Sequence, residues 1–219
     1  IQVFSKFLKD RSFGELSDTS KHYVDKIIAS SNRMRVLIMD ILTYSRLSAT
    51  ESRLEPVDLT KLFREILEDF DLRVSEESAK IQLNPLCVVE GNKGQLRQVF
   101  HNLVSNALKF TVSGRTPSLT IELKNIDAKE LRLSLDNSEN YCRICVCDNG
   151  IGFEEKFSSS IFNLFEKLNP KATYEGSGIG LAIAKKIIDR HHGLVIAKSV
   201  VGEGSEFSVI LPFKQPRSH

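Results

Sequence analysis

The chain has 219 residues, of which 41% are hydrophobic and 26% are charged, as is typical of globular proteins and not of disordered or collagen-like chains. Its 30 basic and 28 acidic side chains give a formal net charge of +2, and neither sign forms the long basic stripe typical of nucleic-acid-binding proteins. Four cysteines without a secretory leader or a long apolar run predict a cytoplasmic protein with free thiols and no membrane contact by this segment.

The first fifty residues are predicted to form a helical hairpin. A short apolar periodicity from Ile1 indicates a first helix that ends near Arg11, and residues 12–17 fit a helix–helix turn. A second helix, from about Asp18 to Ser48, carries a seam at alternating steps of three and four residues: Val24, Ile27, Ser31, Met34, Ile38 and Ile41. Two antiparallel helices cannot bury all of this apolar surface, so we expect a homodimer through a four-helix bundle. Packing of the hairpin on a neighbouring domain of its own chain is the alternative.

After a linker that contains Pro56, helices and strands alternate irregularly. Helices are predicted from Asp58 to about Ser78, over 93–110 and after Gly178. Strands are predicted at 81–83, 88–89, 119–123, 131–135 (paired with 119–123), 141–147, 194–198 and 206–211. This order predicts an α+β fold in which helices collect on one face of a mostly antiparallel sheet. The expected units are a hairpin (1–50), a linker (51–57), a second domain (58–214) and a tail (215–219).

The helix over 93–110 carries three polar residues on one stripe beside its apolar face. Asn102, Asn106 and Lys109 stand at i, i+4 and i+7, although asparagine is a mediocre helix former. A solvated surface would explain them. The functional interpretation is that an asparagine amide oxygen binds Mg²⁺ and that Lys109 faces phosphates.

Two glycine-containing segments predict a nucleotide site. Asp148 directly follows a strand, where its carboxylate can accept a hydrogen bond from an exocyclic amine, and Gly150 and Gly152 allow the backbone to approach a flat ring. The segment Glu175–Leu181 places three glycines before a helix, where free N–H groups bind phosphates. Its spacing excludes a Rossmann fingerprint and a P-loop, whereas a plain turn is the alternative.

The remaining candidate residues are assigned structural roles. Phe162 and Phe165 are expected in the core, and residues 169–174 between them and the glycines are a candidate lid over nucleotide. Strand alternation separates Cys142 from Cys145 and Cys147, and Cys87 is expected to lie far away, which argues against zinc. His191 and His192 end a helix and are expected to offset its dipole.

In this order the motifs closely resemble the catalytic core of two-component sensor histidine kinases, in the GHKL (Bergerat) ATPase superfamily. The segments 98–111, 148–153, 161–165 and 176–181 resemble its N, G1, F and G2 boxes, and 202–207 resembles its last glycine motif. Residues 43–47 and 54–59 resemble the passage from the dimerisation helix to the ATP domain. The resemblance covers essentially the whole chain.

The resemblance implies ATP and Mg²⁺ as cofactors and a role for each matching residue. Asn106 would bind Mg²⁺, assisted by Asn102, and Asp148 would accept the adenine amino group. Lys109 and, more weakly, Lys167 would act on the phosphates during transfer. The remaining residues implied to contact nucleotide are Phe110, Gly150, Gly152, Tyr174, Gly176, Ser177, Gly178, Ile179, Gly180 and Leu181.

The implied function is transfer of the ATP γ-phosphate to a histidine, followed by relay to an aspartate of a response-regulator receiver domain. The family's acceptor histidine is followed by an acid and a proline, which His22 lacks, and Ile1 aligns about ten residues beyond it. We therefore expect a fragment that binds nucleotide without phosphorylating itself. The alternatives are a non-catalytic dimeric scaffold, or an Hsp90-like or MutL-like ATPase, in which a glutamate would occupy the position of Asn102.

Overall fold

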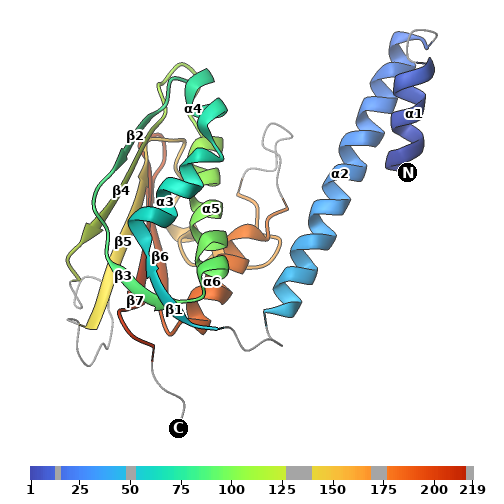
Figure 1. The fold of residues 1–219 in the computed structure, drawn as a ribbon. Coiled ribbons are helices and arrows are strands. Elements are labelled where there is room, and N and C mark those ends of the chain that lie inside the picture. Colours follow the sequence, from blue (N-terminus) through green and yellow to red (C-terminus); the bar gives the residue numbers. More distant parts are fainter. Residues whose placement is uncertain (13–15, 48–52, 127–139, 169–176, 216–219) are drawn as a thin grey trace.

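The computed structural model describes residues 1–12, 16–47, 53–126, 140–168 and 177–215. The chain begins with an antiparallel hairpin of α1 (Gln2–Ser12) and α2 (Asp18–Arg46), as predicted. The Ser17 hydroxyl caps α2, and Lys9 on α1 pairs with Asp25 on α2 at 2.8 Å. Figure 1 shows that the far end of this hairpin stands away from the rest of the molecule. Within the described ranges, no helix combines the length and the hydropathy that a membrane span requires.

The hairpin leaves many apolar side chains of both helices exposed in the single chain. Seven of them lie at Phe4, Phe7, Ile27, Met34, Ile38, Met39 and Ile41. A second copy that covers them would complete a four-helix bundle, so the dimer stays a prediction.

The predicted linker ends in a strand. β1 (Glu55–Asp58) pairs antiparallel with β3 (Val88–Gly91), so three residues expected in the linker are hydrogen-bonded to the domain. Pro56 is tolerated because proline can occupy the edge of a two-stranded ribbon. Residues 48–52, where the linker prediction begins, lie outside the described ranges.

The helix predicted from Asp58 to Ser78 is divided in two. α3 (Leu59–Glu68) begins after Asp58, whose carboxylate accepts the Lys61 N–H, and α4 (Asp71–Glu76) follows a break at Phe70. The Phe70 ring packs on His101 of the next helix at a centroid distance of 4.9 Å. The break between the two helices thus coincides with a ring contact to another helix.

The main sheet has the order β2-β4-β5-β7-β6, in which β2 and β4 are parallel and every other pair is antiparallel. The strands are β2 (Lys80–Leu83), β4 (Ser118–Lys124), β5 (Tyr141–Asp148), β6 (Leu194–Val200) and β7 (Gly204–Pro212). The described partners of β4 are β2 and β5, whereas the strand predicted at 131–135 lies outside the described residues.

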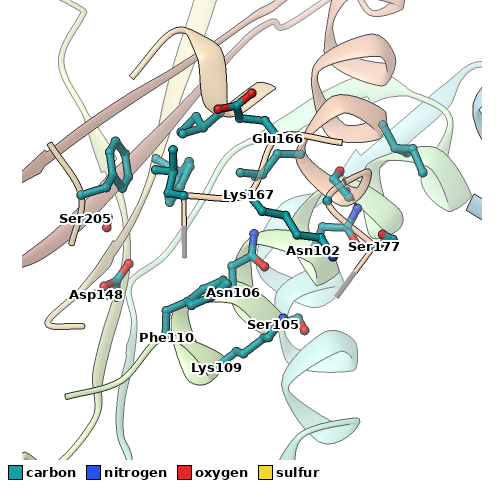
Figure 2. A pocket seen from close by; sticks show the side chains of 18 of the residues that line it. Asn102, Ser105, Asn106, Lys109, Phe110, Asp148, Glu166, Lys167, Ser177 and Ser205 are labelled. Carbon is teal, nitrogen blue, oxygen red and sulfur yellow. Dashed lines mark hydrogen bonds between the residues drawn. The ribbon is translucent and has the colours of Figure 1, made fainter. Parts of the chain in front are cut away.

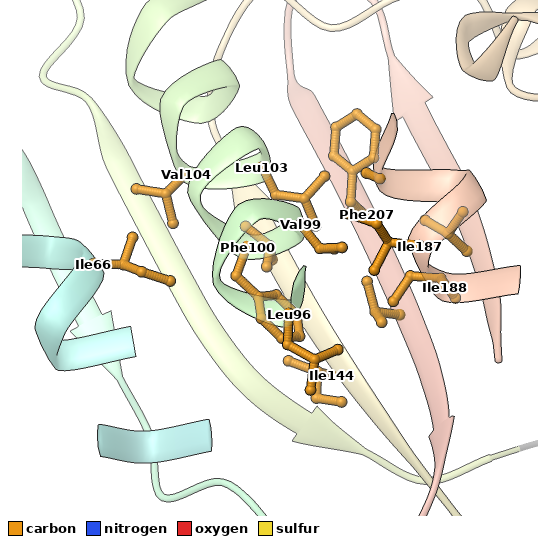
Figure 3. Packing of buried hydrophobic residues seen from close by; sticks show 14 of the residues in the cluster. Ile66, Leu96, Val99, Phe100, Leu103, Val104, Ile144, Ile187, Ile188 and Phe207 are labelled. Atoms are coloured by element: carbon orange, nitrogen blue, oxygen red, sulfur yellow. The ribbon is translucent and has the colours of Figure 1, made fainter. Parts of the chain in front are cut away.

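The core lies between this sheet and a layer of helices that covers one of its faces (Figure 1). α5 (Lys93–Lys109) runs through the middle of the helical layer, beside α3 and α6 (Gly180–Arg190). In Figure 3 the apolar face of α5 packs between Ile66 of α3, Ile144 of β5 and the α6 residues Ile187 and Ile188. The predicted α+β fold is confirmed.

Two residues that follow the ends of elements, His191 after α6 and Gln215 after β7, join other parts of the fold in ways that the sequence did not suggest. His191, which follows α6, is buried, and its Nε2 accepts the Asn92 N–H at 3.1 Å while Nδ1 donates to the Ile187 carbonyl. This tautomer is neutral, and burial lowers the pKa of His191, so it does not offset the helix dipole as expected. Gln215, assigned to the tail, is buried and donates to Glu90.

Candidate nucleotide site

A cavity of about 390 Å³ opens beside the polar stripe of α5. Its volume is within the range of small-molecule sites. Figure 2 shows Asn102, Asn106 and Lys109 on one wall, with Ser177 and Lys167 beside them and Asp148 opposite. The predicted residues that line it are Asn102, Asn106, Lys109, Phe110, Asp148, Gly152, Lys167, Ser177, Gly178, Gly180 and Leu181.

The other predicted residues occupy different positions. Gly150 lies against the backbone of Phe110, just outside the lining. Ile179 is fully buried in the core, so it is not available for side-chain contact with a ligand. Tyr174, Gly176 and the lid proposed over 169–174 lie outside the described residues.

Asp148 is the last residue of β5, and its carboxylate borders the cavity. One of its oxygens accepts the Gly150 N–H at 2.8 Å. Burial raises the pKa of Asp148 to about 6, although the N–H groups of Gly150 and Ser205 partly offset that rise. A desolvated carboxylate at a cavity wall gains much by accepting a hydrogen bond from a ligand, which suits an exocyclic amine.

The glycines near Asp148 are required by close backbone contacts. A Cβ on Gly150 would lie 2.2 Å from the Phe110 carbonyl oxygen, and a Cβ on Gly152 would lie 2.1 Å from the Val200 carbonyl oxygen. Gly152 also has a φ of +60°, in the left-handed region that glycine tolerates. Side chains at these positions would displace the loop that follows Asp148.

On α5, the two asparagines have different surroundings. Asn102 Nδ2 donates to the Gly180 carbonyl at 2.9 Å, which joins α5 to the first turn of α6. The Asn106 side chain makes no hydrogen bond within the described part of the chain, and it points into the cavity (Figure 2). An amide oxygen so placed fits Mg²⁺, which takes oxygen ligands. The Lys109 ammonium lies 4.8 Å from the centroid of the Phe110 ring.

The N-terminus of α6 faces the same cavity. Gly178 has a φ of +74°, and the Ser177 hydroxyl accepts the Ile179 N–H at 3.2 Å. The first N–H groups of α6 lack partners within their own helix, so they can donate hydrogen bonds to phosphate oxygens. Lys167 packs against Gly178, within reach of the same ligand groups. Anion-binding groups and the Asn106 amide therefore share one end of the cavity.

The prediction that both phenylalanines of the 161–165 segment are core residues is half wrong. Phe162 is buried and meets Phe207 edge-on. Phe165 is 59% exposed with a φ of +65°, and its N–H donates to the Gly178 carbonyl at 3.0 Å. That hydrogen bond to the glycine segment turns the chain, which carries the Phe165 ring away from the core.

Helix α2 also contributes to the cavity, through Val36 and Asp40. The Lys186 ammonium of α6 donates to the Tyr44 carbonyl at 2.9 Å and lies 3.9 Å from the Tyr44 ring centroid. This contact holds α2 beside α6. Val36 and Asp40 fall within the helix that the sequence predicts from about Asp18 to Ser48. No pattern in the sequence identifies the element that these two residues face.

The cysteines lie as the strand alternation predicts, with one correction. Cys145 and Cys147 both approach Glu206 at 3.8 Å, whereas Cys142 faces the core. Cys87, expected to be distant, is hydrogen-bonded to Cys142, which with burial raises the pKa of the Cys142 thiol. Among the described residues, no three of the His, Cys, Asp and Glu side chains converge to hold a metal.

The chain matches a known protein family over more than half of its length. Residues 91–215 match the model of the "Histidine kinase-, DNA gyrase B-, and HSP90-like ATPase" family. The chain is 31% identical to the phytochrome-like protein Cph1 of Synechocystis sp. over 97% of its own length and 27% of that protein. It is 29% identical to the sensor histidine kinase AtsR of Burkholderia thailandensis over 92% of its length and 33% of that protein. The chain thus spans about a quarter to a third of these relatives.

Solved structures show the same architecture. Full-length ShkA in complex with AMPPNP superposes with a TM-score of 0.70 at 26% identity, over all of this chain and 43% of that one. The histidine kinase ThkA, in complex with the response regulator TrrA, superposes with a TM-score of 0.68 at 23% identity, over 96% of this chain and 57% of that one. The second likeness, at its lower identity, shows the fold alone.

Proposed function

Because the chain belongs to the histidine kinase-, DNA gyrase B- and HSP90-like ATPase family, we propose that it is the ATP-binding core of a sensor histidine kinase. The observation that carries this proposal is the convergence of three distant segments on one cavity. They are the strand-end carboxylate of Asp148, the helix amide of Asn106 and the N-terminus of α6. A purine, a metal ion and a phosphate chain require these three kinds of group, respectively.

The proposed pose runs from Asp148 to α6. Asp148 accepts a hydrogen bond from the adenine amino group, and Gly150 and Gly152 keep the loop beneath the ring free of side chains. The Phe110 ring, at the C-terminal end of α5, lies near the purine. Adenine recognition then depends on one half-buried carboxylate. Because this carboxylate is partly desolvated, a complex that leaves it without a hydrogen-bond donor is costly.

At the other end of the cavity, this chain positions the phosphates. Asn106 is the proposed Mg²⁺ ligand, and Asn102 keeps α5 at a fixed distance from α6. When bound, Mg²⁺ would neutralise charge on the phosphate oxygens. Lys109, Lys167 and the N–H groups of the described glycine segment 177–180 hold those oxygens and stabilise the charge that develops during transfer. Positioning and charge neutralisation are most of what phosphoryl transfer requires of a protein.

The proposed acceptor is a histidine outside this chain, with onward relay to a response-regulator aspartate. His22 lies on an exposed part of α2 without the acid and proline of the family pattern. The exposed seam of α1 and α2 supports dimerisation, and the similar kinase ThkA was solved bound to a response regulator, TrrA. A cytoplasmic location suits these partners and remains part of the proposal.

Incubation with γ-labelled ATP and Mg²⁺ tests the proposal. The 219-residue chain should bind nucleotide and stay unlabelled, whereas the complete gene product should acquire an acid-labile, base-stable phosphate. The Asp148→Asn variant of the complete product should not acquire this phosphate. Stable label on His22 would contradict the assignment of the acceptor, and nucleotide binding without any transfer in the complete product would favour the non-catalytic scaffold.

A further inference from the structure

Arg115 connects three segments that are far apart in the sequence. It lies in the connection between α5 and β4, and its Nη1 donates to the carbonyl of Asn149 at 3.0 Å and to that of Gly202 at 2.9 Å. Asn149 follows β5 directly, and Gly202 is in the turn between β6 and β7. One guanidinium nitrogen, with one N–H for each carbonyl, therefore joins this connection to both neighbouring loops.

One of these loops lines the proposed purine site through Ile151 and Gly152, and the other is hydrogen-bonded to it. Asn149 is covalently next to Asp148, and the Gly202 N–H donates to the Ile151 carbonyl at 2.8 Å. The Ile151 N–H in turn donates to the Phe110 carbonyl at 2.9 Å. The loop 149–152 is thus held on one side by the end of α5 and on the other by the β6–β7 turn.

The Asn149 side chain fixes the same point from a second direction. Its Oδ1 accepts the Ser118 N–H at 2.8 Å, and its Nδ2 donates to the Thr116 carbonyl at 3.0 Å. With Arg115 bonded to its carbonyl, Asn149 is held through both its side chain and its backbone. Little backbone motion is therefore left at the peptide bond that joins Asp148 to Asn149.

Arg115 itself is exposed and is absent from the lining of the cavity. It can therefore affect a ligand only through the loop that it holds. A misplacement of a binding group by about 1 Å is enough to lose most of a directional hydrogen bond.

We propose that Arg115 is a positioning residue that aims the Asp148 carboxylate at the exocyclic amino group of the purine, and so sets the preference for a 6-aminopurine. The inference rests on the proposed function, in which Asp148 accepts that hydrogen bond. It assigns to Arg115 a share of base selectivity and no direct contact with nucleotide.

The test compares two nucleotides on the 219-residue chain: ATP, and purine riboside triphosphate, which carries hydrogen in place of the amino group. The wild type should bind ATP about tenfold or more tightly than the analogue, as expected when a buried acceptor loses its donor. Arg115→Ala should reduce this ratio by about threefold to tenfold through weaker ATP binding, with little change for the analogue. Arg73→Ala, which removes a half-buried arginine paired with Glu77 at the end of α4, should leave the ratio unchanged.

If Arg115→Ala left the ratio of the two affinities unchanged, for example by weakening the binding of both nucleotides equally, the inference would be overturned. Amide hydrogen exchange supplies a second measurement: exchange at Ile151 and Gly202 should accelerate in Arg115→Ala while core amides of α5 keep their protection. Unchanged exchange at both amides would equally overturn it. A wild type that does not distinguish the two nucleotides would instead refute the role of Asp148 in the proposed function.

Discussion

The Nδ2 atom of Asn102 lies 2.9 Å from the carbonyl oxygen of Gly180, and this contact joins the middle of α5 to the first turn of α6. Asn106 stands one turn farther along α5, so the same contact sets the spacing between the proposed metal ligand and the phosphate-binding helix end. The hydrogen bond requires a donor on Asn102, which explains an amide here rather than a carboxylate.

Asn102→Asp should weaken ATP binding by about tenfold or more. The substitution preserves the shape of the side chain, but it places a carboxylate oxygen against the Gly180 carbonyl and adds negative charge near the proposed phosphates. Titration calorimetry measures the change. Asn32→Asp on exposed α2, where the Asn32 Oδ1 accepts from Gln2, is the matched control and should bind as the wild type does. Wild-type affinity in Asn102→Asp would contradict the proposed pose.

Gly150→Ala should weaken nucleotide binding and lower the free energy of unfolding by about 1–3 kcal/mol, because the new methyl group would overlap the Phe110 carbonyl. Gly94→Ala is the control, since its Cβ would meet nothing closer than 3.5 Å within a helix. There alanine should be neutral or stabilise the fold by up to about 1 kcal/mol. Denaturant unfolding compares the two, and equal effects would show that the Gly150 contact is unimportant.

The preference for ATP over purine riboside triphosphate should fall as pH drops below about 6, because the raised pKa of Asp148 is about 6 and protonation weakens its hydrogen bond to the amino group. Using the ratio of affinities cancels the titration of the phosphates, which both nucleotides share. A ratio that stays constant between pH 8 and pH 5 would argue against Asp148 as the acceptor.

The same carboxyl predicts how the stability of the unliganded chain varies with pH. The folded pKa of Asp148 is raised above its ordinary value of 3.8, so its contribution to stability is fully present below about pH 4 and is lost as pH rises through about 6. Asp148→Asn should remove this component of the pH dependence. Denaturant midpoints measured from pH 4 to pH 7 for the wild type and the variant provide the comparison. Parallel plots of midpoint against pH would contradict the contribution assigned to Asp148.

Glu206→Gln should destabilise the fold by about 2–4 kcal/mol, because it removes a carboxylate that compensates the charge of a buried guanidinium. Glu206 Oε1 lies 2.9 Å from Arg143 Nη2, whose side chain is 5% exposed, and Lys124 approaches Oε2 at 2.7 Å. Burial opposes ionisation of Glu206, but these partners and Ser208 hold its pKa at about 2. This stabilisation is present above about pH 4.5 and is lost as pH falls through 2.

The control for that substitution is Glu203→Gln on the exposed β6–β7 turn, which should change the free energy of unfolding by less than about 0.5 kcal/mol. Urea denaturation at pH 7 distinguishes the two variants. Equal stability of Glu206→Gln and the wild type would mean that the Glu206 carboxylate is not required to compensate the charge of Arg143.

The sequence predicted those parts of the fold and site that depend on local pattern. The apolar periodicity of α5 places Asn102, Asn106 and Lys109 on a common stripe wherever the helix packs, and Asp148 must point from the end of its strand. These local constraints are strong enough to bring the predicted residues of both motifs to one cavity once the helix covers the sheet.

Features that depend on distant contacts were not predictable in the same way. The break at Phe70 coincides with a contact to the His101 ring, and the exposure of Phe165 coincides with a hydrogen bond to the Gly178 carbonyl. The neutral tautomer of His191 follows from the Asn92 N–H that its Nε2 accepts. Each partner lies on another element. No periodicity within a single segment contains that information.

Titration calorimetry of the 219-residue chain with ATP, with and without Mg²⁺, tests the central claim most directly. We predict binding of one nucleotide per chain, loss of most of the affinity in Asp148→Asn, and loss of the Mg²⁺-dependent part in Asn106→Ala. No heat of binding from the folded wild type, or unchanged affinity in both variants, would contradict a nucleotide site between α5, the end of β5 and the start of α6.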